Sequence, residues 1–259
     1  MFGFNFVTKT TSFVKTKNIS ESDFQLQIPN NFAFYKNDLH MKEIKTYYWR
    51  NLPHIHPIGA TFFVTFRLYG SIPLIKLIEL REEYESEVLN IKLSKNGKQQ
   101  DLIEEAQKRH FVKYYALLDA MLEGPDYLKM SGVADLIKSE LHRYDNKHYD
   151  LLAYCIMPNH VHSLIDTGLQ LSEDLSSLGL EEINYVPLSR IMKNIKGVTA
   201  VYCNRYLSRS GKFWQRESYD HYVRNEQSLE RIVAYILNNP VKARLVNHWE
   251  EWPYSYLRW

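Results

Sequence analysis

Two histidines separated by one residue, His160 and His162, are the strongest candidates for chemistry in this sequence. They open a run of apolar and β-branched residues that predicts a strand over residues 160–165. Side chains of a strand alternate between its two faces, so both imidazoles are expected to project from the same face. Two neutral imidazoles placed in this way can bind one divalent ion, although such a triplet taken alone more often marks two partly exposed polar residues.

A second triplet with the same spacing, His54-Ile55-His56, provides an internal comparison. Pro53 and Pro57 flank it, and proline disfavours the interior of a strand because it removes a backbone donor. We therefore expect this pair to lie in a loop, where it could orient another group or contact a substrate.

A helix capped by Asn225 is predicted to run to about residue 238, before Pro240. Tyr235 lies in this helix, and Asn239 lies four residues further on, at its C-terminal end. The apolar residues of this helix form one stripe, and Tyr235 and Asn239 fall together beside it. A nucleophilic hydroxyl and an amide oxygen would then emerge from one side of the helix. From the spacing alone, a tyrosine at an amphipathic boundary and an asparagine at the helix C-terminus are the simpler explanations.

Several separate motifs occur in an order that resembles a known family. They are Met157-Pro158-Asn159-His160-Val161-His162, Phe213-Trp214-Gln215, Tyr235-Ile236-Leu237-Asn238-Asn239-Pro240-Val241-Lys242-Ala243 and Trp252-Pro253-Tyr254-Ser255. Together they resemble the HUH single-tyrosine transposases, which are IS200-like, and in particular the REP-associated tyrosine transposase branch. The resemblance extends from about residue 47 to the C-terminus. Arg244 departs from it, because that branch often has glycine at this position.

The resemblance implies that His160 and His162 bind a divalent metal, that Asn239 completes the ligand set and that Tyr235 is the nucleophile. It implies Mg²⁺ or Mn²⁺ as the ion. The implied activity is that of a metal-dependent single-stranded DNA endonuclease and strand transferase, which cleaves next to a hairpin or palindromic repeat through a covalent 5′-phosphotyrosine intermediate. The resemblance leaves the oligomeric state open between a monomer and a homodimer.

Two other functions remain open from the residues themselves. One is a non-catalytic module that binds single-stranded nucleic acid, since ferredoxin-like sheets commonly display aromatic side chains to single strands. The other is a metal-dependent nuclease that uses water, for which His160 and His162 would suffice.

The distribution of charge adds a candidate DNA-binding tract. No acidic residue occurs from residue 183 to residue 216. A DNA-binding tract and a solvated helix face explain this charge distribution equally well. The residues of this tract that we expect to contact DNA are Arg190, Lys193, Lys196, Arg205, Trp214, Gln215 and Arg216.

The elements that must position these groups predict an α+β fold. Strands are expected over residues 60–67, 149–156, 160–165 and 219–224, and helices over residues 131–143 and 187–207 and after Asn225. Two charged, leucine-spaced helices over residues 73–91 and 101–123 are expected to form a helical hairpin insertion. This order is typical of a ferredoxin-like, RRM-like antiparallel sheet with helices on one face.

The bulk composition is that of an ordinary globular protein. Of the 259 residues, 45% are hydrophobic and 24% are charged, which excludes disordered, fibrous and disulfide-scaffold proteins. The sequence contains no apolar run long enough to cross a membrane and no secretory signal, so we expect a cytoplasmic protein that is nucleoid-associated in a bacterium. We expect a loosely ordered extension over residues 1–40 and one catalytic domain over residues 41–259, with its insertion at about residues 73–124.

Overall fold

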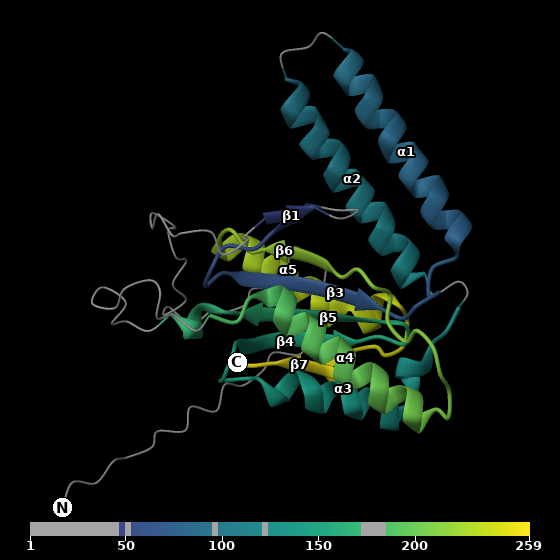
Figure 1. The fold of residues 1–259 in the computed structure, drawn as a ribbon, viewed down its shortest axis with the longest axis vertical. Helices are drawn as coiled ribbons and strands as arrows, with labels where there is room; N and C mark the ends of the chain where they lie inside the picture. Colours follow the sequence, from purple (N-terminus) through teal and green to yellow (C-terminus); the bar gives the residue numbers. More distant parts are fainter. Residues whose placement is uncertain (1–46, 50–52, 95–97, 121–123, 172–184) are drawn as a thin grey trace, which may run out of the picture. The chain divides into compact units, whose positions relative to one another are not determined.

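The computed structural model describes residues 47–49, 53–94, 98–120, 124–171 and 185–259. Its centre is a five-stranded antiparallel sheet in the order β6-β3-β5-β4-β7 (Figure 1). The strands are β3 (Thr61–Arg67), β4 (Asp150–Ile156), β5 (His160–Asp166), β6 (Tyr219–Tyr222) and β7 (Ser255–Leu257). The predicted antiparallel α+β fold is confirmed, whereas the extension predicted over residues 1–40 lies outside the described residues.

The pairing of β3 with β5 defines the two faces of the sheet. The two strands pair along their whole length, with Thr65 opposite His162. Phe62, Val64 and Phe66 point to the other side of β3 and belong to the main hydrophobic core. One face of the sheet is therefore apolar, and the other carries the histidines.

Two helices cover the apolar face. α3 (Ser131–Arg143) and α4 (Leu188–Tyr206) pack against each other, and their buried residues join the core that contains Phe62 and Phe66 (Figure 1). Their bounds agree with the helices predicted from the apolar spacing. α3 begins at Ser131, and its N-cap residue, Met130, makes no side-chain capping hydrogen bond.

The last helix lies on the opposite face. α5 (Glu226–Lys242) contacts β4 and β5 (Figure 1). The hydroxyl of its Tyr235 approaches His162. The expectation that the helices cover one face therefore holds for α3 and α4 and is wrong for α5. The reason is that Leu229, Val233 and Ile236 form a separate buried stripe, which needs a sheet face of its own.

α5 begins where the sequence predicts and ends later. The side chain of Asn225 accepts a hydrogen bond from the backbone N–H of Ser228 at 2.8 Å, as expected of an N-cap. The helix then continues through Pro240 to Lys242, so the predicted stop before Pro240 is wrong. The φ of proline suits a helix, and burial of Leu237 and Pro240 offsets the loss of one backbone donor.

The predicted helical hairpin is present between β3 and α3. It consists of α1 (Leu74–Leu93) and α2 (Gln99–Asp119), which pack against each other. α2 ends at Asp119, close to the sheet face that carries the histidines. None of the helices in the described part of the chain combines the length and the apolarity needed to span a bilayer.

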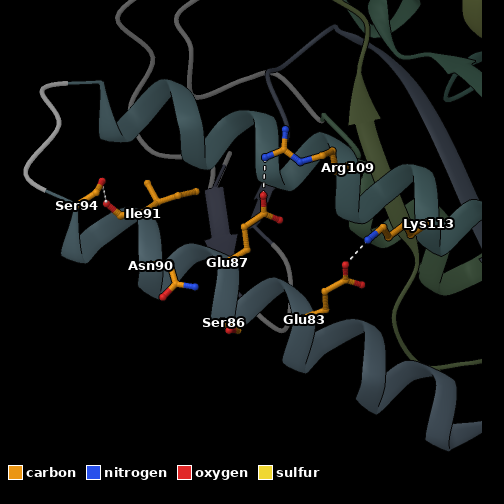
Figure 2. A pocket seen from close by; sticks show the side chains of 8 residues that line it. All are labelled: Glu83, Ser86, Glu87, Asn90, Ile91, Ser94, Arg109 and Lys113. Carbon is orange, nitrogen blue, oxygen red and sulfur yellow. Dashed lines mark hydrogen bonds and ion pairs between the residues drawn. The ribbon is translucent and has the colours of Figure 1, made fainter.

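A shallow groove of about 570 Å³ runs between α1 and α2. Figure 2 shows that the basic groups in it point at carboxylates of the other helix: Arg109 Nη2 lies 2.5 Å from Glu87 Oε1, and Lys113 pairs with Glu83. These pairs neutralise the two cations. The groove is lined by none of the predicted site residues.

Two short pairings were not predicted. β1 (Tyr47–Trp49) pairs with β2 (Pro53–Ile55), so the expectation that His54 lies in a loop is wrong. Pro53 is the first residue of β2, a position where proline is tolerated. β7 pairs with β4 at the other edge of the main sheet.

Candidate active site

His160 and His162 lie side by side on the sheet face that α5 covers. Both side chains are fully buried, and their two Nε2 atoms face each other at 2.9 Å. Because the side chains of β5 alternate between the two faces of the sheet, both imidazoles lie on one face, as the sequence predicts.

The outer nitrogen of each ring is held by a neighbouring side chain. His160 Nδ1 lies 2.6 Å from Asn159 Oδ1, and the Asn159 amide nitrogen donates to the carbonyl of Leu118 at 3.3 Å. This orientation of the amide makes Nδ1 the protonated nitrogen of His160 and leaves a lone pair on its Nε2. His162 Nδ1 lies 2.7 Å from Thr65 Oγ1. A ligand histidine is commonly held through its second nitrogen in this way.

The donor set fits a divalent cation. Burial lowers the pKa of His160 to about 3 and places that of His162 well below its usual value, so both rings are neutral near neutral pH. With the proton of His162 on Nδ1, where Thr65 Oγ1 can accept it, both Nε2 atoms present a lone pair to the space between them. A cation between them would satisfy both lone pairs.

Tyr235 approaches the histidine pair from α5. Its hydroxyl lies 3.4 Å from His162 Nε2, and its ring makes edge contacts with Phe63 and Tyr115. Burial and then the carboxylate of Asp119 raise the pKa of Tyr235. Burial and the Asp119 carboxylate thus disfavour the phenolate of Tyr235. A cation bound by the histidines would favour it.

Asn239 lies one turn further along α5, inside the helix rather than at its cap. It is 1% exposed, and neither its amide oxygen nor its amide nitrogen has a hydrogen-bond partner among the described residues. A buried amide without partners is costly, so a ligand for its oxygen is a physically reasonable explanation.

Asp119 is a site residue that the sequence did not reveal. Its Oδ1 lies 3.8 Å from His160 Nε2, and one ligand atom from each of Asp119, His160 and His162 lies within 4.8 Å of the others. Burial raises the pKa of this carboxyl to about 6, against the opposing charge of Lys242. Asp119 lies far from the histidines in the sequence, and the packing of α2 brings it close to them. No local sequence pattern could therefore have indicated it.

The predicted DNA-binding residues divide into exposed and structural groups. Arg190, Lys193, Arg205 and Arg216 are exposed, and the first three lie on α4, across the sheet from the histidines. Gln215 is partly buried, and its backbone N–H donates to the carbonyl of Arg67.

Two of the predicted DNA-binding residues have structural contacts instead. Trp214 is 6% exposed, packs edge-on against Phe66 and donates to Thr199 Oγ1 at 2.9 Å, so its ring is buried where the predicted DNA contact requires it to be exposed. The Lys196 ammonium lies 2.8 Å from the carbonyl of Gln215, 3.0 Å from that of Arg216 and 2.9 Å from Ser218 Oγ. It holds the segment before β6 in place.

His56, the second member of the comparison triplet, is buried away from the histidine pair. Its Nε2 lies 2.6 Å from Asp220 Oδ2 on β6. The pair joins the segment after β2 to the edge of the main sheet.

Parts of this chain are similar to known proteins. Residues 129–239 match the family model "Transposase IS200 like", a range that contains His160, His162, Tyr235 and Asn239. A Haemophilus influenzae protein described as a REP-associated tyrosine transposase is 32% identical over 111 residues, which are 42% of this chain. The match spans 60% of the length of that relative.

A solved structure of a REP-associated tyrosine transposase bound to a REP hairpin shows 17% identity and a TM-score of 0.44, covering 83% of this chain and 82% of that chain. Residues 129–239, which contain β4, β5, the histidine pair and Tyr235, are therefore similar to the IS200-like transposase family.

Proposed function

We propose that this chain is a metal-dependent, single-tyrosine endonuclease and strand transferase that acts on single-stranded DNA. The observation that carries the proposal is the meeting of Tyr235 Oη with the Nε2 of a buried histidine pair, 3.4 Å from His162. The matched family and the relative described as a REP-associated tyrosine transposase support the same activity.

His160, His162 and the amide oxygen of Asn239 would hold the cation, for which Mg²⁺ and Mn²⁺ are the expected ions. When bound there, such an ion supplies Lewis-acid stabilisation of charge on a phosphate. The second nitrogen of each histidine is held by Asn159 or Thr65, so the ring orientations are fixed before DNA arrives.

Tyr235 would attack the phosphorus of a phosphodiester. The bond between Oη and phosphorus forms as the bond from phosphorus to the 3′ oxygen breaks, which leaves a 5′-phosphotyrosine and a free 3′-hydroxyl. The phenolic proton is balanced by protonation of the 3′ oxygen. The energy of the phosphodiester is conserved, so a later strand transfer needs no nucleotide cofactor.

The DNA partner would be a single strand with a hairpin or palindromic repeat. Arg190, Lys193 and Arg205 form an exposed basic surface on α4 that would contact phosphates. We expect Lys193→Ala to weaken DNA binding and to reduce its dependence on salt. An unchanged salt slope in a binding titration would remove this surface from the proposal.

The activity can be tested with labelled single-stranded hairpins from DNA flanking the gene, incubated with Mn²⁺ or Mg²⁺. We expect an adduct that survives a denaturing gel and is lost in Tyr235→Phe and His160→Ala. Tyr69→Phe, which alters an exposed tyrosine outside α4 and α5, is the matched control and should retain the adduct.

The other outcomes distinguish the alternative functions. Cleavage that persists in Tyr235→Phe and releases free ends would indicate a nuclease that uses water. Binding of the hairpins without cleavage by the wild type would indicate a non-catalytic module.

A further inference from the structure

We propose that Asp119, the last residue of α2 in the helical hairpin, is a direct ligand of the metal held by His160 and His162. This inference rests on the metal site of the proposed function. It adds to that site a residue outside residues 129–239, the range that matches the family model.

The position of the carboxylate carries the argument. Asp119 Oδ1 lies 3.8 Å from His160 Nε2, and ligand atoms of Asp119, His160 and His162 lie within 4.8 Å of one another. Ligand bonds to a divalent ion measure about 2.0–2.2 Å, so ligand atoms on one ion lie about 3–4 Å apart. The three groups are already near that spacing.

The carboxylate also lacks the partners that a structural aspartate would have. Its side chain is 11% exposed, and neither oxygen accepts a hydrogen bond from a described residue. A buried carboxylate normally has both a cationic partner and hydrogen bonds. A bound cation would supply the missing interactions.

Lys242 is a weak substitute for such a cation. Its Nζ lies 3.6 Å from Asp119 Oδ2, beyond hydrogen-bonding distance, and its side chain is 63% exposed. A long, exposed side chain can move away with little loss of packing. Lys242 would therefore partly balance Asp119 without the metal and compete with the ion for it.

Charge ranks Asp119 above Asn239 as a ligand. A carboxylate carries a full negative charge and an amide oxygen does not, so in a buried site the carboxylate gains more from a divalent ion. Hard ions such as Mg²⁺ and Mn²⁺ also prefer carboxylate oxygens. Two imidazoles and one carboxylate leave coordination positions open for a phosphate.

The test is a titration of the full-length protein with Mn²⁺ alone. Binding is measured by calorimetry and by the loss of the electron paramagnetic resonance signal of free Mn²⁺. We expect Asp119→Asn to weaken binding by more than about tenfold, because even residues that only orient a ligand change affinity by about 10–100-fold. Asp101→Asn is the matched control, since it makes the same change at an exposed site on α2. Its affinity should stay within about twofold of the wild type.

Lys242→Ala separates a ligand from a merely structural aspartate. Loss of the competing cation should tighten Mn²⁺ binding if Asp119 coordinates the ion, and Asp119→Asn should remove that gain. Circular dichroism would verify that the variants are folded.

The failures are distinguishable. Wild-type affinity in Asp119→Asn, with binding lost in His160→Ala, would overturn the role of Asp119 and leave the proposed function standing. Absence of Mn²⁺ binding by the wild type would overturn both.

Discussion

The Asp119 carboxylate lies in a position that costs stability when it is charged. Burial raises its pKa from an ordinary value of 3.8 to about 6, so the folded protein holds this proton more firmly than the unfolded chain does. The stability linked to this group is therefore fully present below pH 3.8 and is lost as the pH rises through 6.

Asp119→Asn should for this reason stabilise the metal-free protein. With a chelator at pH 7.5, we expect its melting temperature to exceed that of the wild type by a few degrees, and the difference should shrink at pH 5. Thermal unfolding followed by circular dichroism measures both values. An equal difference at the two pH values would contradict the charge-based explanation.

Lys196 and Lys193 lie within one turn of α4 and should respond differently to substitution. Lys196→Ala removes the donor shared by the carbonyls of Gln215 and Arg216 and by Ser218, and we expect a loss of about 1–3 kcal/mol in the free energy of unfolding. Lys193 is exposed, so Lys193→Ala should change stability by less than about 0.5 kcal/mol. Urea unfolding distinguishes the two, and similar losses would rule out the structural role of Lys196.

Periodicity explains which site residues the sequence could reveal. The two-residue period of a strand places His160 and His162 on one face whatever surrounds them. The helical period does the same for Tyr235 and Asn239. Asp119 and the burial of Trp214 depend on contacts between segments far apart in the chain, which no local pattern encodes.

At the scale of elements, the N-terminus of α5 determines where the tyrosine helix starts. Asn225→Ala removes the acceptor for the backbone N–H of Ser228 and should lower the free energy of unfolding by about 1 kcal/mol. Asn194→Ala on the exposed side of α4 is the control, because alanine favours a helix interior. Denaturant unfolding of both variants tests the cap, and equal stabilities would show that Asn225 contributes nothing.

Long elements with a clear period were predictable, and short or proline-containing ones were not. The strand predicted over residues 60–67 and the helix over residues 131–143 agree with β3 and α3. β7 has three residues, too few for a period to emerge, and it forms only because β4 offers a free edge. The passage of α5 through Pro240 reflects burial, which overrides the local preference to end the helix.

At the scale of the whole described fold, the sheet separates two surfaces with different chemistry. α5 and the end of α2 enclose the histidines on one face, and α4 presents Arg190, Lys193 and Arg205 on the other. On the proposed function, a DNA strand bound to that basic surface would have to pass an edge of the sheet to reach Tyr235. The basic surface would then fix a part of the DNA that lies away from the cleaved bond.

Burial of the two neutral histidines makes the fold sensitive to acid. Their folded pKa values lie below the ordinary 6.5, with that of His160 at about 3, so the unfolded chain binds more protons between these values. Stability linked to each histidine is fully present above pH 6.5 and is lost as the pH falls below that value, for His160 down to about 3, at up to about 1.4 kcal/mol per pH unit. Asp119 has the opposite sign and offsets part of this loss below pH 6.

Acid and metal should therefore act on stability through the same cluster. In a chelator, lowering the pH from 7 to 5 should reduce the free energy of unfolding of the wild type more than that of a His160→Gln/His162→Gln variant. At pH 7, Mn²⁺ at about 100 times its Kd should add about 2.7 kcal/mol to the wild type and nothing to the variant. Urea unfolding under these conditions measures both effects, and an identical pH response in the two proteins would mean that the acid sensitivity arises elsewhere.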